Sequence, residues 1–464
     1  MKEAVKSREI VIEELQGDTL TPISIYQRLK GKKKFLLESS LKHEDSGRYS
    51  FIGANPAVEL KGSNGQTFLI KEDDVKEMNE KPLEVMKSLM PKEIQVDYKS
   101  IPFVGGAVGF VGYDVVRHYE NIGDIPRDEL QIPDVHFMMF EEIVVFDHLY
   151  QKVYLVGVPL LKETTLDRLE SQLSRIKEEI QKGDDFDQQP VEISSYEASM
   201  TRADFVEKIK KAKEYIVEGD IFQVVLSQRM KASIKGDPFS FYRKLRIQNP
   251  SPYMYYLDFE DYIVAGVSPE SLIKSSENIV ITNPIAGTRP RGKTADEDNR
   301  LEDELLADEK ELAEHRMLVD LGRNDIGRVS RFGTVNIDKY MVIEKYKHVM
   351  HIVSEVSGEL TNQYKPIDAL IACLPAGTVS GAPKIRAMEI INELEKLKRG
   401  VYSGAIGYFS ANGNMDFALA IRTMVIKGME AYIQAGAGIV YDSVPEKEFD
   451  ETIHKLRAFL EDEK

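Results

Sequence analysis

Apolar and polar positions alternate, or apolar residues run together, over many short stretches of this chain. Such runs, bounded by Gly, Pro, Asn or Asp, are typical of β-strands. The predicted strands cover residues 10–12, 35–40, 49–53, 58–60, 103–113, 135–140, 143–146, 152–156, 221–229, 253–259, 262–267, 279–282, 402–409, 415–426 and 430–437. Helical spacing with N-cap and C-cap signals predicts helices over residues 22–31, 80–90, 166–180, 201–218, 238–248, 302–322, 366–374, 382–397 and 445–460.

The order of these elements predicts an α+β fold. Strands follow strands and do not alternate strictly with helices, which favours mostly antiparallel sheets over a doubly wound parallel sheet. The polar, proline-containing stretch at 181–199 is the best candidate for a linker. We therefore predict an N-terminal region over residues 1–185, a linker over 186–200 and a second domain over 201–464.

Composition and charge narrow the class of protein. The 464 residues are 42% hydrophobic and 30% charged, as in an ordinary globular protein. The net charge of −16 argues against nucleic acid or an anionic membrane as a partner. No apolar run could span a bilayer, and the first residues lack the apolar stretch of a secretory signal. The single cysteine, Cys373, lies between apolar residues, so we expect it to be buried in a protein of the reducing cytoplasm.

The stretch at residues 283–292 is the first candidate for chemistry. It contains two glycines, two prolines, a threonine, Arg289 and Arg291, and an acidic helix follows it. We predict a stiff loop there, because proline fixes φ and glycine lets the backbone approach a ligand. The arginines could bind an anion, or they could be solvated or paired with the acidic stretch.

Two pairs of glutamates suggest a metal site. Glu311 and Glu314 lie three apart on one predicted helix, and Glu448 and Glu451 lie three apart on the last one. Residues at this spacing share a helix face. If the helices face each other, four carboxylates meet at one point, which suits a hard divalent cation. The alternative is that both pairs are ordinary solvated surface.

Several further positions have a structural and a functional interpretation. Glycine-rich turns predicted at 376–383 and 436–438 could simply reverse the chain, or their N–H groups could bind a carboxylate. Arg422 lies in a predicted apolar strand, where it needs either a structural carboxylate or an anionic substrate. His351, also in an apolar strand, is either a core histidine or a proton carrier.

Together these motifs resemble a known family. They lie at residues 284–292, 318–325, 375–384 and 436–440, and two N-terminal stretches at 36–39 and 47–51 agree as well. The chain resembles the chorismate-utilising enzymes, and most closely their anthranilate-forming members. The resemblance implies two large antiparallel sheets packed as a sandwich with helices outside. It also implies a lyase that adds ammonia at ring C2 of chorismate with loss of water and then eliminates pyruvate.

The resemblance assigns roles to individual residues. Glu314 and Glu451 match direct Mg2+ ligands, and Glu311 and Glu448 match carboxylates that support the metal. Glu270 matches the general acid for loss of the ring hydroxyl, so its pKa should be raised by burial or neighbouring carboxylates. His351 matches the histidine of pyruvate elimination, and Thr288 is a further catalytic candidate. The groups that match chorismate-binding positions are Gly287, Thr288, Tyr402, Arg422, Gly436, Ala437, Gly438 and Lys455.

Two positions favour one branch of the family. Relatives that add water carry a lysine base where this chain has Gln223, and aminodeoxychorismate synthases carry a lysine nucleophile where it has Ala286. Both substitutions favour direct attack by free ammonia. The alternatives are aminodeoxychorismate synthesis and a regulatory subunit that binds chorismate or tryptophan without catalysis.

The resemblance also implies partners. Ammonia would come from a separate glutamine amidotransferase subunit, in a heterodimer or heterotetramer, because this chain has no cysteine nucleophile in a turn. Ser39, Pro252, Tyr253 and Met254 match a site at which tryptophan inhibits the enzyme.

Overall fold

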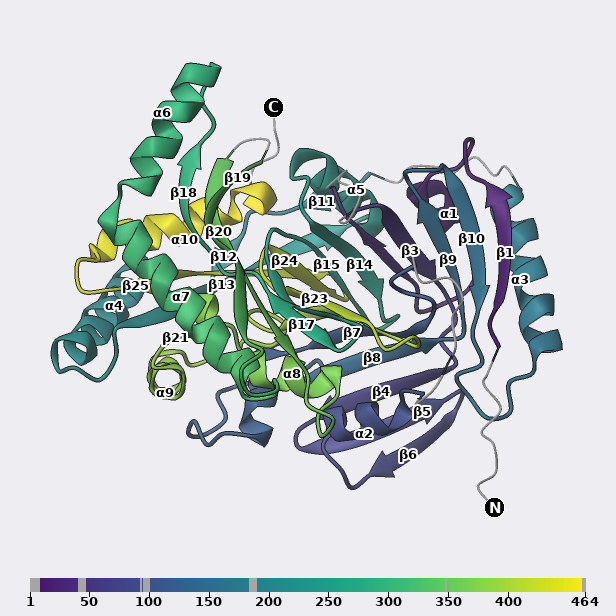
Figure 1. Ribbon diagram of the computed structural model, residues 1–464. Coiled ribbons are helices and arrows are strands. Elements are labelled where there is room, and N and C mark those ends of the chain that lie inside the picture. Colours follow the sequence, from purple (N-terminus) through teal and green to yellow (C-terminus); the bar gives the residue numbers. More distant parts are fainter. Residues whose placement is uncertain are drawn as a thin grey trace.

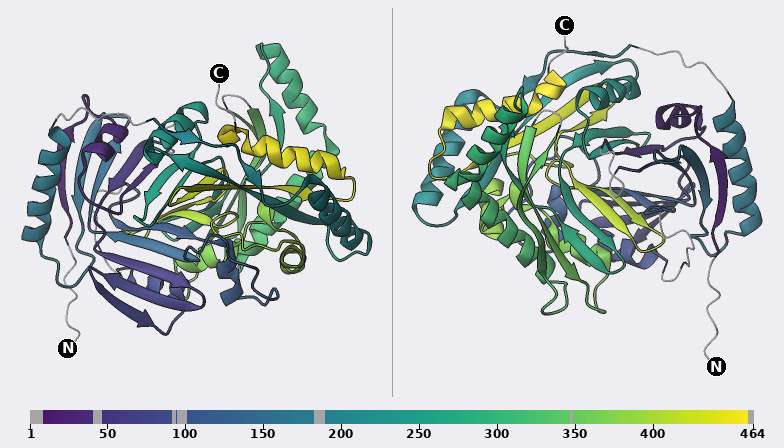
Figure 2. Two further views of the ribbon diagram at one scale, coloured as in Figure 1. Left: turned by 180° about the vertical axis from the view of Figure 1, so that it is seen from behind. Right: turned by 45° about the horizontal axis from the view of Figure 1, so that its top comes forward.

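Two large antiparallel β-sheets packed face to face form the centre of the computed structural model (Figure 1). The structure describes residues 9–40, 47–91, 94, 101–182, 190–346 and 349–460. Helices cover the outside of both sheets in every view (Figure 2). The predicted α+β sandwich is therefore confirmed.

The first sheet has thirteen strands within the described residues, and its named strand pairings are all antiparallel. Eleven strands follow one another across it: β1 (Val11–Gln16), β10 (Lys152–Gly157), β9 (Glu142–Asp147), β3 (Tyr49–Gly53), β2 (Phe35–Glu38), β14 (Tyr253–Asp258), β15 (Tyr262–Ser268), β24 (Thr423–Lys427), β25 (Glu430–Ile439), β13 (Gln223–Lys235) and β11 (Glu192–Ile193). Two short strands, β12 (Glu197–Ala198) and β21 (Gly381–Ala382), also pair with β13.

The second sheet has twelve strands by the same count. In order these are β18 (Ile285–Pro290), β20 (Val349–Glu359), β17 (Ile279–Thr282), β16 (Ser271–Ser276), β23 (Met415–Leu419), β22 (Ala405–Ser410), β7 (Gly106–Val111), β8 (Val135–Phe140), β4 (Val58–Ser63), β5 (Gln66–Lys71) and β6 (Asp74–Met78). The remaining strand, β19 (Asn336–Lys345), pairs with β20.

The helices begin at the caps that the sequence provides. Thr201 caps α4 through a reciprocal hydrogen-bonded pair with Asp204, and Asp308 accepts from two backbone N–H groups of α7. The α-helices are α1 (Pro22–Arg28), α2 (Pro82–Leu89), α3 (Leu166–Gln181), α4 (Arg202–Val217), α5 (Pro238–Gln248), α6 (Ala295–Leu306), α7 (Glu309–Gly327), α8 (Pro366–Cys373), α9 (Lys384–Leu394) and α10 (Pro445–Leu460). Short 3-10 helices lie at Tyr113–His118 and Gly377–Val379. In the described part of the chain, no helix has the length and apolar character needed to cross a membrane.

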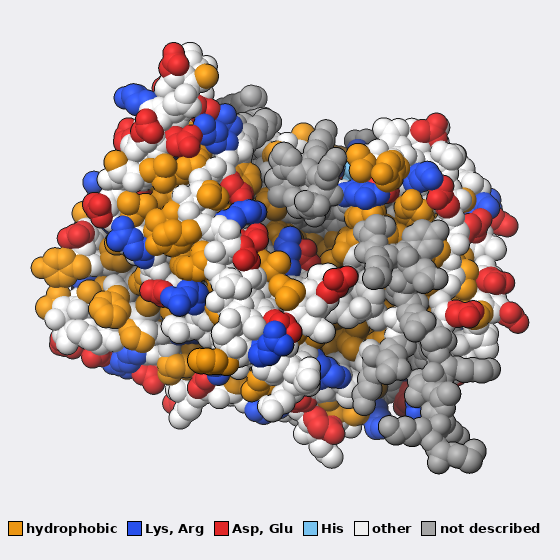
Figure 3. Space-filling model, in the orientation of Figure 1, with side chains coloured by type: hydrophobic (Ala, Val, Ile, Leu, Met, Phe, Trp, Pro, Cys, Tyr) orange, Lys and Arg blue, Asp and Glu red, His pale blue; other side chains and the backbone are white. Residues whose placement is uncertain are grey.

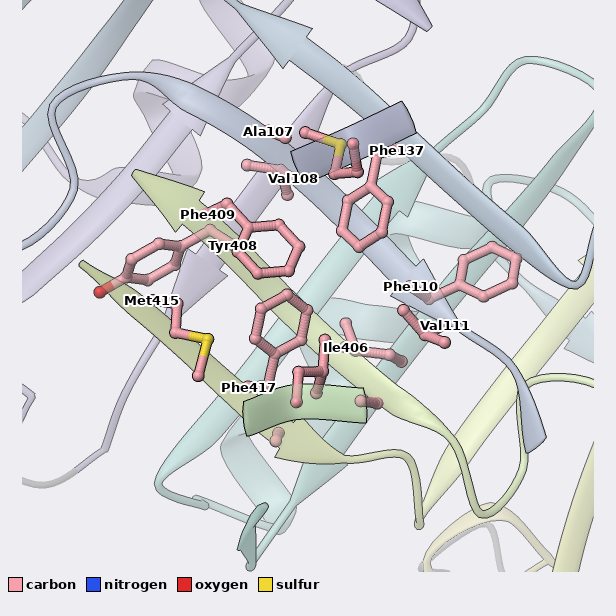
Figure 4. Packing of buried hydrophobic residues seen from close by; sticks show 14 of the residues in the cluster. Ala107, Val108, Phe110, Val111, Phe137, Ile406, Tyr408, Phe409, Met415 and Phe417 are labelled. Atoms are coloured by element: carbon pink, nitrogen blue, oxygen red, sulfur yellow. The ribbon is translucent and has the colours of Figure 1, made fainter. Parts of the chain in front are cut away.

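The core between the sheets is built from aromatic and branched side chains of both. In the second sheet, Phe137, Phe409 and Phe417 lie in mutual ring contact (Figure 4). Phe35 of the first sheet joins the same cluster and is fully buried. Burial of a phenylalanine side chain contributes on the order of 1.5–3 kcal/mol. Cys373 is also buried here, as predicted, and burial raises the pKa of its thiol.

Three predicted elements are wrong in a way that bears on the site. The expected strand over 415–426 is two strands, because the chain leaves the second sheet after Leu419 and enters the first at Thr423. The expected helix over 302–322 is two helices, since the Asp308 side chain caps a new one. The turn expected at 436–438 is uninterrupted strand within β25, where Gly436 and Gly438 leave room for neighbouring side chains.

The expected loop at 283–292 is also wrong, since most of it is the edge strand β18. Its arginines serve structure. Arg289 donates to Asp308 at 2.8 Å, and Arg291 Nε donates to Asp298 at 3.0 Å. Of the interpretations considered for Arg289 and Arg291, the structure supports pairing with the acidic stretch that follows.

Strands from both sides of the predicted linker share each sheet. In the first sheet β2 pairs with β14, and in the second β7 pairs with β22. Residues 192–193 and 197–198, inside the predicted linker, pair with β13, whereas residues 183–189 lie outside the described residues. The division into an N-terminal region, a linker and a catalytic domain stays a prediction.

Candidate active site

A cavity of about 330 Å3 lies beside β18, β20 and β25, with α7 and α10 at its edge. It brings together residues that are far apart in the sequence. The predicted site residues in its wall are Glu270, Thr288, Glu314, His351, Tyr402, Arg422, Gly436, Gly438 and Lys455. Ala286, at the position that selects the family branch, lines it too.

The chain passes from one sheet to the other in two neighbouring segments, which we call the crossings. One crossing supplies an acidic side chain to the cavity and the other supplies a cationic one. Glu270 lies between β15 of the first sheet and β16 of the second, and Arg422 lies just before β24, where the chain returns. Hydrogen bonds join the crossings: Leu419 N–H donates to the Glu270 carbonyl at 3.0 Å, and Val267 N–H donates to the Arg422 carbonyl at 3.1 Å. Ser268, which is fully buried, donates its hydroxyl to the Leu419 carbonyl at 2.7 Å.

Glu270 has the properties of a proton donor near neutral pH. Burial raises its pKa to about 7, although Thr378, Lys455 and Arg422 all favour the ionised form. The Thr378 hydroxyl donates to Glu270 Oε1 at 2.8 Å. A carboxyl group with a pKa near the working pH can protonate a leaving group efficiently.

Arg422 is available to an anion. Its backbone is left-handed, with φ of 48°, so it is not in the strand where it was expected. The side chain is exposed to the cavity, yet enough protein surrounds it that burial lowers its pKa. Within the described residues, the acidic group that acts on its pKa is Glu270 of the same cavity, and no side-chain hydrogen bond contributes. The guanidinium is therefore not tied to a purely structural carboxylate.

His351 and Thr288 form a hydrogen-bonded pair at the β18 bulge. Gly287 has no strand partner and a φ of 70°, so Thr288 lies opposite His351 in the ladder. His351 Nδ1 lies 3.1 Å from the Gly287 carbonyl, which can only accept, and 3.0 Å from Thr288 Oγ1. Nδ1 therefore carries the proton. Burial lowers the pKa of His351, which leaves Nε2 of the neutral ring free to accept a proton.

The four predicted metal carboxylates lie on α7 and α10. Burial, Glu311 and Glu451 all raise the pKa of Glu314, and its hydrogen-bond partner is the neutral amide Nε2 of Gln223 at 3.3 Å. Burial and Glu451 likewise raise the pKa of Glu448. Among the residues that the structure describes, no three acidic, His or Cys side chains converge closely enough to hold a metal by themselves.

This donor set fits Mg2+, which usually takes only one or two carboxylates and completes its shell with water and substrate oxygens. A divalent cation would stabilise carboxylates of like charge that lie this close together. Lys455 partly does so now, since its Nζ lies 2.8 Å from Glu451 and donates to the Gly436 carbonyl at 2.9 Å.

The glycines of β25 make room for the cavity. A Cβ on Gly436 would lie 2.7 Å from the Tyr402 hydroxyl, and one on Gly438 would lie 2.6 Å from Gln223 Nε2. Ala437, predicted to hold substrate, is fully buried in the hydrophobic cluster on the opposite face of the strand. The Gly287 position faces Glu311 and Leu305, so it shapes the bulge and is not in the cavity wall.

The four predicted inhibitor residues line a second cavity, of about 540 Å3. Ser39 comes from the segment after β2, and Pro252, Tyr253 and Met254 come from the start of β14. Tyr253 donates to Asp416 at 2.8 Å. Pro252 lines both cavities, so the two cavities share a wall.

Sequence reasoning missed Thr378, Gln434 and Tyr346, all of which line the first cavity. Thr378 lies inside one of the predicted glycine-rich turns, but nothing local to it indicates a contact with Glu270. Gln434 precedes Gly436 and Gly438 by two and four positions on the same strand. Strand alternation would have placed it on the cavity face if β25 had been predicted through to its end.

Comparisons with known proteins agree with this geometry. Residues 32–461 match the family described as chorismate binding enzyme. The chain is 47% identical to anthranilate synthase component 1 of Acetivibrio thermocellus, over 96% of this chain and 93% of that protein. It is 42% identical to aminodeoxychorismate synthase component 1 of Bacillus subtilis, over 92% and 91%. The crystal structure of anthranilate synthase component I from Streptococcus pneumoniae superposes with a TM-score of 0.83 at 45% identity, over 96% of this chain and 99% of that one.

The fold is thus a sandwich of two sheets, and its candidate active site contains residues from the segments in which the chain passes from one sheet to the other. The chain belongs to the chorismate binding enzyme family.

Proposed function

We propose that this chain is the large subunit of an anthranilate synthase, a lyase that converts chorismate and ammonia to anthranilate, pyruvate and water. The observation that carries the proposal is Glu270, a carboxyl with a pKa of about 7, in a cavity that also contains the guanidinium of Arg422. The similarity to anthranilate synthase component 1 over almost the whole chain supports it.

In the first half of the reaction, the cavity binds a dianion and breaks a carbon–oxygen bond. Arg422, Tyr402 and the backbone around Gly436 would hold one carboxylate of chorismate. Glu270 gives its proton to the ring 4-hydroxyl, which leaves as water while ammonia adds at C2. The added nitrogen then loses a proton, which the Glu270 carboxylate can accept.

In the second half, the ring becomes aromatic. His351 Nε2 takes the proton from C2, the bond from C3 to the enolpyruvyl oxygen breaks, and the ring electrons complete the aromatic system. The released enolpyruvate takes a proton at carbon and becomes pyruvate. Thr288 and the Gly287 carbonyl keep His351 in the tautomer that this step needs.

Mg2+ is part of the same proposal. Glu314 and Glu451 would hold it directly, and Glu311 and Glu448 would support it through water. Its charge would neutralise the second substrate carboxylate, which explains how a chain with a net charge of −16 binds a dianion.

Aminodeoxychorismate synthesis is the second candidate, because one relative carries that name. That interpretation needs an amine nucleophile at position 286, where this chain has the methyl group of Ala286 in the cavity wall. The deciding experiment incubates the purified chain with chorismate, Mg2+ and an ammonium salt at alkaline pH. Fluorescent anthranilate is expected. Formation of aminodeoxychorismate alone would assign the chain to the other branch of the family. If neither compound is formed, a non-catalytic subunit would be favoured.

Inhibition by tryptophan at the second cavity is proposed as well. Ser39→Phe would place a large ring in that cavity, and it should relieve inhibition while activity persists. Ser195→Phe, at an exposed position outside the cavity, is the matched control. Unchanged inhibition in Ser39→Phe would remove Ser39 from the inhibitor site.

The partner and the location complete the proposal. Ammonia would be supplied by a separate glutamine amidotransferase subunit, consistent with relatives that are named component 1. We place the complex in the cytoplasm, as predicted from the sequence.

A further inference from the structure

A further small cavity lies directly behind Glu270. Its volume is about 40 Å3, and Glu270, Leu318 and Thr378 line both this small cavity and the candidate active site. These three side chains therefore form a partition between the two cavities. A volume of this size holds a few water molecules at most and is too small for chorismate.

Helix α7 supplies one wall of the small cavity. Leu318, Gly322 and Asp325 line it at intervals of four and three residues, so they share one face of the helix. The opposite face is exposed and charged, with Arg323 paired to Asp320 at 3.1 Å. Basic and acidic side chains lie over α7 in Figure 3, at the place where Figure 1 labels that helix. The small cavity is thus on the inner side of α7.

Polar groups in the wall of the small cavity can bind water. The Glu270 carboxyl and the Thr378 hydroxyl lie in the partition, and Asn283 and Asp325 line other parts of the wall. Asp325 Oδ2 accepts from Lys384 at 2.7 Å, but a carboxylate has about four acceptor positions and can accept from water as well. A buried water makes about three hydrogen bonds, so these groups are sufficient to hold one.

The proposed reaction forms a water molecule at this partition. The bond from C4 to the hydroxyl oxygen breaks, its electron pair stays on oxygen, and the proton of Glu270 completes the water. Ammonia forms its bond at a different ring atom, C2. If bulk water is excluded while the reaction proceeds, the new water stays against C4 and can return to the ring unless the protein binds it elsewhere.

We propose that the small cavity is the binding site for the leaving water, which moves from C4 past Glu270 and is held there by Asn283, Asp325 and Thr378. This inference rests on the proposed function. Ammonia is similar in size to water, but the cavity lies behind the acid that serves C4, so its position fits the leaving group and not the nucleophile.

Gly322→Ala tests this assignment, because it adds a methyl group to the wall and leaves every polar group in place. The new Cβ would lie 3.1 Å from Thr282 Cγ2 and 3.5 Å from Pro284, and alanine is a better helix former than glycine. With ammonium chloride as the nitrogen source, we expect kcat for anthranilate formation to fall at least about tenfold while KM for chorismate stays within about twofold. Gly327→Ala in the same helix is the matched control, since its Cβ would have open space, and it should keep wild-type kinetics.

High-resolution crystal structures provide a second measurement. The wild-type chain should show an ordered water in the small cavity, bonded to at least two of its polar groups, and Gly322→Ala should lack it. If Gly322→Ala folds poorly, Asn283→Leu, which replaces a polar wall group with an apolar one of similar size, should give the same fall in kcat.

Three results would overturn the proposal. The first is a small cavity without water in the wild-type chain, and the second is wild-type kcat in a folded variant that has lost the water. The third is a higher KM for ammonia with kcat unchanged at saturating ammonia, which would show that the cavity admits the nucleophile. Failure of the wild-type chain to form anthranilate from ammonium chloride would instead refute the proposed function, whatever the small cavity contains.

Discussion

The hydroxyl of Thr378 stabilises the ionised form of Glu270, so its removal should move the pH dependence of the reaction upward. Thr378→Val keeps the shape of the side chain and deletes the hydrogen bond of 2.8 Å to Glu270 Oε1. The other two groups that lower the pKa of Glu270, Lys455 and Arg422, stay in place.

The size of the shift follows from the energy of that contact. A hydrogen bond to a charged group contributes about 1.5–3 kcal/mol. One pKa unit corresponds to about 1.36 kcal/mol, so the pKa of Glu270 could rise by about one to two units. The hydroxyl can also accept a hydrogen bond from the protonated acid, which places the expected shift near about one unit. The pKa would thus move from about 7 to roughly 8.

The assay is the pH profile of kcat/KM for chorismate, followed by anthranilate fluorescence at constant free ammonia. The pH dependence of kcat/KM reports the pKa values of the catalytic groups in the free enzyme. Because Glu270 must be protonated to act, activity falls as pH rises through its pKa, and in Thr378→Val this fall should begin about one unit later. Thr378→Ser keeps the hydroxyl and should leave the midpoint in place. A midpoint that stays or moves down in Thr378→Val would show that Glu270 is not the titrating acid.

Three further outcomes are expected. Glu451→Gln should abolish turnover and remove any rise in melting temperature that Mg2+ gives the wild-type chain; an active variant would contradict the metal assignment. Gly287→Ala forces a side chain into a left-handed position with contacts of 3.1–3.2 Å, so denaturant unfolding should show a loss of about 1–2 kcal/mol, whereas Gly413→Ala, with open space around it, controls for the backbone alone. Phe417→Ala should cost about 3–5 kcal/mol by the same measurement, and a loss below about 1 kcal/mol would contradict its place in the core.

The local pattern predicted strands and helices better than it predicted how they assemble. Apolar residues follow one another almost without a break from Met415 to Ile426, and such a run is compatible with a buried strand in either sheet. Nothing local marks the crossing, because Arg422 takes its left-handed backbone from contacts with a distant strand. Similarly, Asp308 could have been recognised as an N-cap, but the acidic residues around it obscured the break.

The resemblance named residues that the structure brings together in one cavity, whereas contacts between distant elements could not be predicted from the sequence. Spacing alone could not tell whether the glutamates of α7 and α10 face solvent or each other; the interaction of Glu314 with Glu451 depends on how distant helices lie. The side chain of Ala437 shows the effect of strand alternation. Once β25 is a strand, alternation puts the residue between Gly436 and Gly438 on the far face, in the hydrophobic core.

The two crossings explain why the acid and the cation can act together. Within a regular strand, side chains alternate between two faces, and both faces of these sheets are occupied by core or helices. Glu270 and Arg422 are not confined to either face of a sheet, because each lies where the chain passes from one sheet to the other. The buried Ser268 hydroxyl and the backbone bond between Leu419 and Glu270 fasten the crossings to each other. The proton donor and the anion-binding guanidinium are therefore positioned by one shared junction, and a change that loosens it would disturb acid catalysis and carboxylate binding together.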